Sequence, residues 1–418
     1  MGMPATSSSA EDAFRTGFRL WLRRNAPRAD AVTGAPKTGY SDAESVERAR
    51  NWQRKLHRAG HIAEAWPQAP GDEASSFSRR MIVQQELIAA RAPALIGESG
   101  LRRVAPLLLR LAAAEQRARF LDRIASGEDL WCIAEIEAGV SPETIALEDG
   151  ETIVVSGRKR SMPMATIADW ILCLARCRSA APGSLFEFCW LAIPSRSPGV
   201  QIPGRPSIND DATSADLVFT GVRVPRENLI GHIPGWDAAK ATADPEGQTL
   251  AADPTATRLH FDDLLRLARR KSRAGLRVLR DPVVRQRLAE LATRLDAVEC
   301  FAQRVLAAAL SNRPDQDAAA QATRELAKAD RDICRLALEI LGLPGGLVRR
   351  PTARQVPETA WVEEHLAALA RLALASPRLH PTSPAMPKTL AARPPLGFDG
   401  RQARLSSAAD QPAAARRK

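Results

Sequence analysis

Two pairs of side chains in this sequence have a spacing that is typical of metal-binding sites. His57 and His61 lie four residues apart, and so do Cys173 and Cys177. Neither a histidine nor an acidic third ligand follows the histidine pair nearby, and no second cysteine pair matches the first. We therefore expect no metal site at either pair. The sequence also shows no phosphate-binding loop and no serine–histidine–aspartate arrangement.

The charge of the chain bears on whether the protein binds nucleic acid. The 418 residues carry a formal net charge of +11. Residues 377–418 contain eight Lys and Arg against two Asp, so a net of +6 belongs to this segment and +5 to everything before it. Basic residues are not interleaved with aromatic ones, as they are in nucleic-acid readers. We interpret the excess charge as a solvated tail, and nucleic-acid binding is the least favoured function.

No targeting or membrane segment is visible. The sequence contains no uncharged apolar stretch of about 18 residues or more, and its first residues lack a charged region followed by an apolar one. The six cysteines lie mostly in apolar runs, which is typical of buried thiols in a reducing compartment. We expect a cytoplasmic protein without a membrane partner.

The periodicity of apolar residues changes twice along the chain. Residues 1–129 have helical periodicity, and residues 130–233 contain short β-branched and aromatic runs separated by turn sequences such as EDGE and SPGV. This second segment is typical of antiparallel strands. The sequence therefore predicts an α+β fold that begins with a helical domain and continues with a β domain.

Helical periodicity returns over residues 234–376. Asp281 followed by Pro282 is a helix start, and apolar residues then recur every three or four positions. A second long helix ends at LGLPGG and a third covers about residues 357–375, so we expect a C-terminal helical bundle. Residues 377–418 contain seven prolines without apolar periodicity, which predicts a disordered basic tail.

Several strings in this order resemble the acyl-CoA dehydrogenase family. They are WQRKLHRAG at 52–60 followed by AWP at 65–67, QQELIAARAP at 84–93, AEQRARFLDRIASGEDLWC at 114–132, ADW at 168–170, VFTGVRVPRENLIG at 218–231 and GW at 235–236. The similarity covers about residues 45–375. It implies a helical N-terminal domain, a central β domain and a helical bundle, with FAD between the β domain and the bundle. The implied reaction is α,β-dehydrogenation of an acyl-CoA thioester, in which a carboxylate takes the α-proton and the flavin takes the β-hydride.

The first flavin motif of the family departs from its usual form in this chain. The family reads roughly QGFSEPGAGSD after the WC dipeptide, and here the string is IAEIEAGVSPE. By resemblance the flavin-contacting positions fall at Ile133, Ile136, Glu137 and Gly139. Ile136 replaces the hydroxyl residue that bonds the flavin edge, and Pro142 replaces a serine. An isoleucine cannot donate a hydrogen bond, and a proline also removes a backbone N–H.

The second flavin motif, usually GxKxWTSG, is also altered. Gly157 and Lys159 are present, but the tryptophan position is Ser161 and the hydroxyl position after it is Met162. Losing a ring contact and a donor should weaken flavin binding by several kcal/mol, to order of magnitude.

The catalytic base is not at its commonest family position, because no GGTSEI-like string occurs in this sequence. A minority of the family places the base after a GW dipeptide that opens the bundle. Counting forward from Gly235 and Trp236, that carboxylate is Glu246, whose neighbours Pro245 and Gly247 disfavour the helix expected there. The alternative interpretation of Glu246 is a plain loop acid.

The resemblance leaves two functional hypotheses. The chain is either a flavin-dependent acyl-CoA dehydrogenase with unusual ring contacts, or a flavin-poor subunit that completes a homo- or hetero-oligomer with an active homologue. The second arrangement resembles the heteromeric acyl-CoA dehydrogenases of actinobacterial steroid side-chain breakdown, in which one subunit has lost the base. In this family the bundle supplies most of the oligomer contacts.

Overall fold

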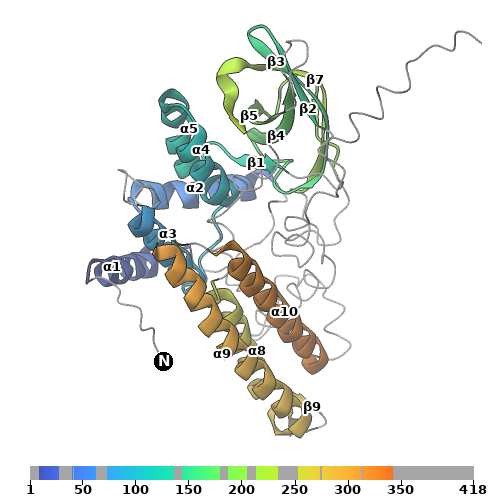
Figure 1. Cartoon of the computed structure of the whole chain (residues 1–418). Helices are drawn as coiled ribbons and strands as arrows, with labels where there is room; N and C mark the ends of the chain where they lie inside the picture. Colours follow the sequence, from blue (N-terminus) through green and yellow to red (C-terminus); the bar gives the residue numbers. More distant parts are fainter. Residues whose placement is uncertain are drawn as a thin grey trace, which may run out of the picture.

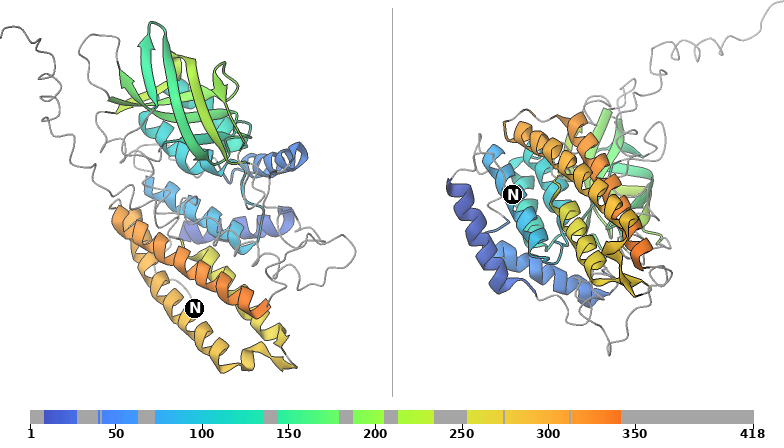
Figure 2. Two further views of the ribbon diagram at one scale, coloured as in Figure 1. Left: turned by 90° about the vertical axis from the view of Figure 1, so that its right-hand side faces the viewer. Right: turned by 90° about the horizontal axis from the view of Figure 1, so that it is seen from below.

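The chain folds into helices, then a sheet, then helices again (Figure 1). The computed structural model describes residues 9–27, 40, 42–62, 73–135, 144–178, 187–204, 213–233, 253–273, 275–311, 313 and 315–341. In the left view of Figure 2 the sheet lies above, the N-terminal helices lie in the middle, and the C-terminal helices lie below. The predicted α+β fold is confirmed. The predicted third bundle helix and the basic tail lie outside the described residues.

All the regular elements in the described part of the N-terminal layer are helices. Asp42 caps the second helix by accepting a hydrogen bond from the Ser45 backbone N–H at 2.7 Å. The last helix ends at Gly127, whose φ of 74° lies in the left-handed region where glycine is favoured. The elements are α1 (Ser9–Asn25), α2 (Ala43–Arg58), α3 (Glu73–Ala89), the π-helix η2 (Gly100–Val104), α4 (Ala105–Leu111) and α5 (Ala114–Ser126).

The central sheet is mixed. Most neighbouring strands are antiparallel, as predicted, but β4 pairs in parallel with both β1 and β2. The path through the sheet is β6-β7-β3-β2-β4-β5-β8, and β1 joins it at β4. The strands are β1 (Trp131–Ala134), β2 (Ile145–Asp149), β3 (Thr152–Met162), β4 (Trp170–Arg178), β5 (Glu187–Pro194), β6 (Val200–Gln201), β7 (Ala215–Pro225) and β8 (Leu229–Ile233), with the 3-10 turn η3 (Arg226–Asn228) before β8.

Strand β4 is buried on both faces. Leu172 and Leu174 pack with the N-terminal helices in a helix–sheet core that also contains Trp131 and Trp190. The alternate residues of β4 point to the opposite face, where β4 and β5 pack with β3 and β7 because the sheet curls over itself (Figure 1). We call this second cluster the sheet core. The buried cysteines Cys132, Cys173, Cys177 and Cys189 belong to it, and all are free thiols.

The C-terminal layer is a helical bundle in its described part. Asp281 accepts a hydrogen bond from the Val283 backbone N–H at 2.9 Å, and Pro282 is the first helical residue, as predicted. Buried leucine and isoleucine side chains from all three helices form a bundle core. The elements are α8 (Thr255–Arg270), the short strands β9 (Ser272–Arg273) and β10 (Leu276–Arg277), the 3-10 turn η4 (Val278–Arg280), α9 (Pro282–Leu310) and α10 (Gln316–Leu341). None of the described helices is long and apolar enough to cross a membrane.

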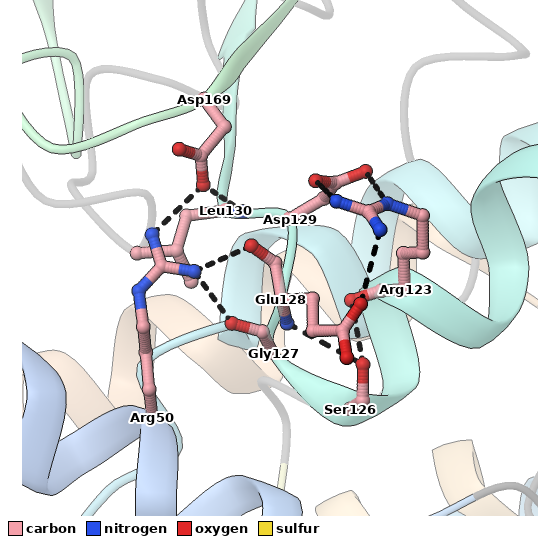
Figure 3. A network of polar contacts seen from close by, with 8 residues as sticks. All are labelled: Arg50, Arg123, Ser126, Gly127, Glu128, Asp129, Leu130 and Asp169. Carbon is pink, nitrogen blue, oxygen red and sulfur yellow. Dashed lines mark hydrogen bonds and ion pairs between the residues drawn. The ribbon is translucent and has the colours of Figure 1, made fainter.

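A polar network joins the N-terminal helices to the sheet (Figure 3). The Asp169 carboxylate accepts from the Leu130 backbone N–H at 2.9 Å and from Arg50 of α2 at 2.8 Å. The same guanidinium donates to the carbonyl oxygens of Gly127 and Glu128. Asp169 therefore fixes the chain where it passes from α5 into β1.

A second set of contacts joins α3 to its neighbours. Arg91, just after α3, forms a two-bond ion pair with the fully buried Asp263 of α8, at 2.9 and 2.5 Å. Glu86 of α3 binds Arg15 and Arg19 of α1. Because α3 contacts both α1 and the bundle, it holds the lower two layers together.

Replacing Asp169 with alanine tests the junction between α5 and β1. The substitution leaves the buried Leu130 N–H without its partner and removes one of the acceptors of Arg50, so the free energy of unfolding should fall by about 1–3 kcal/mol. Asp149→Ala is the matched control, because its pair with Arg223 is exposed on both sides. Its cost should stay below about 1 kcal/mol. Urea unfolding measures both, and an equal loss in the two variants contradicts this role for Asp169.

The carboxyl of Glu86 predicts a pH-dependent contribution to stability. Burial alone raises its pKa, but the hydrogen bonds and charges of Arg19 and Arg15 outweigh burial and hold the pKa below its ordinary value of 4.5. A depressed carboxyl pKa contributes stability above the unfolded value that is lost as pH falls through the folded value. Glu86→Gln should therefore destabilise the protein at neutral pH, and its difference from wild type should shrink as pH falls below 4.5. Denaturant unfolding across acidic pH tests this, with the exposed Glu44→Gln as control; an unchanged difference contradicts it.

Candidate functional site

The ends of strands β1 and β3 carry the described positions at which the sequence predicted flavin contacts. Ile133 lies in β1 opposite Leu172 of β4, and its side chain is buried in the helix–sheet core. Met162 ends β3 opposite Ala215 of β7 and packs against the sheet core. The two side chains therefore contact different cores. The other predicted site residues, Ile136, Glu137, Gly139 and Glu246, lie outside the described residues.

A buried lysine brings the ends of these two strands together. Lys159 of β3 is fully buried, and its ammonium donates to the Leu174 carbonyl of β4 at 2.7 Å and to the Glu135 carbonyl at 3.5 Å. Burying a charged ammonium is costly unless it is hydrogen-bonded. The lysine thus fixes the residue that follows β1 against the edge of β3. The sequence showed Lys159 as part of the family pattern but gave no sign of these partners.

Glu135 is a site residue that the sequence analysis did not identify. It directly follows β1, its side chain is only 10% exposed, and it forms an ion pair with Arg103 of η2. Among the described residues, its second carboxylate oxygen is buried without a hydrogen-bond partner. An unsatisfied buried carboxylate oxygen is costly and marks a polar site. The available signal was an acidic residue within the apolar run WCIAEI.

The turn after β3 has an unusual backbone. Ser161 has a φ of 56° and Met164 has a φ of 64°, both in the left-handed region that is rare for residues with a side chain. The Ser161 backbone N–H donates to Asp216 of β7 at 2.9 Å, and Arg158 binds the other oxygen of the same carboxylate at 2.7 Å. Asp216 therefore holds the bulge of β3 in place. The last glycine of the family pattern GxKxWTSG falls at Met164, where the positive φ explains that preference.

The spaced histidines contact a carboxylate and aromatic rings. His57 Nε2 lies 3.1 Å from the Asp122 carboxylate. The His61 ring packs between Phe18 and Trp21, with ring centroids 4.6 and 4.8 Å away. Their rings thus contact separate groups. Burial raises the pKa of the Cys132 thiol far above its ordinary value, so this thiol does not ionise at neutral pH.

Comparison with known sequences identifies the family. The domain described as acyl-CoA dehydrogenase, N-terminal domain, matches residues 9–128, and the acyl-CoA dehydrogenase C-terminal domain matches residues 234–367. These two matches cover more than half of the chain. The protein belongs to the acyl-CoA dehydrogenase family. The family normally binds FAD.

Individual acyl-CoA dehydrogenases resemble the chain over most of its length. Acyl-CoA dehydrogenase IpdE1 of Mycobacterium tuberculosis is 28% identical over 342 residues, which are 80% of this chain and 86% of IpdE1. The solved structure titled Tcur3481-Tcur3483 steroid ACAD matches with a TM-score of 0.71 at 22% identity, over 93% of this chain and 98% of that one. The ChsE4-ChsE5 complex from Mycobacterium tuberculosis also gives a TM-score of 0.71, at 20% identity, over 95% and 99% of the two chains.

The described residues at the positions predicted to contact flavin do not supply the ring and the hydroxyl of the family motifs. Ile133 is aliphatic and lies in the helix–sheet core. Ser161 supplies no ring, and its backbone N–H is bonded to Asp216. Met162 has no hydroxyl and packs against the sheet core. The scaffold around these positions is that of the family, whereas the side chains on it are not.

Met164→Gly tests whether the turn after β3 stores backbone strain. A side chain in the left-handed region costs about 1–2 kcal/mol, which glycine does not pay. Met162→Gly is the matched control, because Met162 ends a strand and does not have a positive φ. Met162→Gly should therefore lower the free energy of unfolding more than Met164→Gly does, by at least about 1 kcal/mol. Equal losses in thermal or urea unfolding contradict the strain.

Proposed function

We propose that this chain is a subunit of a heteromeric acyl-CoA dehydrogenase and works beside a homologue that binds the flavin. The observation that carries the proposal is the set of side chains at the flavin positions. Ser161 provides no ring at the tryptophan position, Met162 provides no hydroxyl at the position after it, and Ile133 is aliphatic. Ring contact and hydrogen bonding act together on one cofactor, so their joint loss removes more affinity than either loss alone.

The intact scaffold supports a role in assembly. The bundle core is formed by α8, α9 and α10, and Arg91 and Asp263 tie it to the N-terminal layer. Selection for association, without flavin chemistry in this chain, would retain these cores while the flavin positions change. Two of the similar structures are titled as pairs of chains, one of them a steroid ACAD.

The substrate class follows from the family and from those titles. We propose that the complete assembly oxidises acyl-CoA thioesters, with fatty acyl chains or steroid side chains as the acyl group. In this arrangement the partner subunit supplies the flavin and the base that takes the α-proton. Our chain supplies the bundle surface that completes the oligomer. Glu246 is the residue in this chain that would act as the base if the chain were itself catalytic.

The visible absorption spectrum distinguishes the two functions. We expect the full chain purified alone to be colourless, and the chain co-expressed with an acyl-CoA dehydrogenase encoded beside it to co-purify as a yellow complex. Within that complex, Glu246→Gln in this chain should leave kcat unchanged, because the partner supplies the base. The substitution keeps the shape of the side chain while removing its basicity.

Three outcomes contradict the proposal. A yellow protein that turns over alone makes the chain an ordinary flavoenzyme. A collapse of kcat in the Glu246→Gln complex, with KM retained, assigns the base to this chain. A stable complex that never binds flavin makes the chain a structural partner without a dehydrogenase role.

A further inference from the structure

Three side chains, a glutamate, a cysteine and a histidine, lie close together at one end of the sheet. They are Glu148 of β2, Cys177 of β4 and His232 of β8, and one donor atom of each lies within 4.8 Å of the other two. The register explains the meeting. Ala146 of β2 pairs with Cys177, so Glu148 lies two residues further along the same face, and His232 pairs with Cys189 of β5.

We propose that Glu148, Cys177 and His232 form a binding site for a zinc-like divalent cation. Zinc takes thiolate, imidazole and carboxylate donors at about 2.0–2.3 Å, which places neighbouring donors about 3.3–3.8 Å apart. Donor atoms within 4.8 Å of one another therefore need only small side-chain movements to close around an ion. A thiolate and an imidazole together exclude magnesium and calcium, which prefer oxygen ligands.

Two of the three ligands have a charged neighbour. The Glu187 carboxylate lies 3.7 Å from His232 Nδ1, while His232 Nε2 lies 3.9 Å from the Glu148 carboxylate. A carboxylate near the second ring nitrogen is the usual support of a zinc-binding histidine. Arg226 lies 3.6 Å from the same Glu148 oxygen.

Exposure of the site decides what kind of metal site it is. Cys177 is buried, the Glu148 side chain is 17% exposed, and the His232 side chain is 39% exposed. An ion can therefore enter from the His232 side, and a water molecule can occupy the fourth tetrahedral position. Three protein ligands with an open position form an exchangeable site rather than a closed structural one.

The sequence could not show this site. In the sequence Cys173 and Cys177 form a spaced pair. They lie on the same face of β4, because alternate residues of a strand share a face, but Cys173 lies further inside the sheet core. The actual neighbours of Cys177 are 29 positions earlier and 55 later in the chain, on separate strands. The proposal therefore departs from the expectation that the chain has no metal site.

Cobalt titration of the full-length protein tests the proposal. Purified protein kept reduced with a non-thiol reductant should bind one equivalent of Co²⁺ and develop a near-ultraviolet thiolate band with tetrahedral visible bands, both displaced by Zn²⁺. Cys177→Ser should abolish the thiolate band, and His232→Gln should weaken binding strongly. Glu187→Gln should weaken it by about 10- to 100-fold, because it removes only the support of the histidine.

Two controls separate metal binding from a folding defect. Cys300→Ser removes an exposed cysteine on α9 and should leave the cobalt spectrum unchanged. Zn²⁺ should raise the melting temperature of wild type and of Cys300→Ser but not of His232→Gln, which replaces one ligand at a partly exposed position. A spectrum without a thiolate band overturns the proposal. So does a band that survives Cys177→Ser, or a Cys177–Cys189 disulfide in place of the binding thiol.

Discussion

The structure depends on one strand that has no solvent face. Because β4 is covered by the helix–sheet core on one side and by the sheet core on the other, each of its residues must match a neighbour. It pairs with β1, β2 and β5, and Asp169, the residue before it, binds the chain between α5 and β1. The position of the helices, the end of β1 and the Glu148–Cys177–His232 cluster all follow from this strand. A shift of β4 by one residue would exchange its two faces and disturb them together.

The polar groups near the ends of β1 and β3 show how a scaffold is maintained when the side chains on it change. Lys159 bonds to backbone carbonyls, so its role depends on the course of the strands and not on a particular partner side chain. Asp216 likewise holds the β3 bulge through the Ser161 backbone N–H. Such contacts persist whatever side chains occupy Ile133 or Met162.

Local sequence patterns predicted the helices and strands well, but they could not predict contacts between residues that are far apart in the chain. Asp281 and Pro282 marked the start of α9 correctly, because capping and proline geometry involve only neighbouring residues. Helical periodicity over residues 1–129 did not show the break between α4 and α5, where the Gln116 side chain accepts a hydrogen bond from the Ala113 backbone N–H. The two parallel pairings of β4 were missed, since strand direction is not encoded in alternation. At the candidate site, the motif comparison pointed to Ser161 and Met162, but only the structure revealed Glu135, whose partner Arg103 lies 32 residues away.

The ion pair between Arg103 and Glu135 depends on the number of residues in the π-helix η2 before α4. A π-turn contains one residue more than the α-turn it replaces, and one residue rotates a helix by about 100°. Arg103 lies in this turn, between Gly100 and Val104, and points its guanidinium at Glu135. A deletion of a single residue within η2 would restore an α-helix and turn the arginine away without changing any side chain. In this protein the partner of the buried carboxylate thus depends on a helical turn and not on side chains alone.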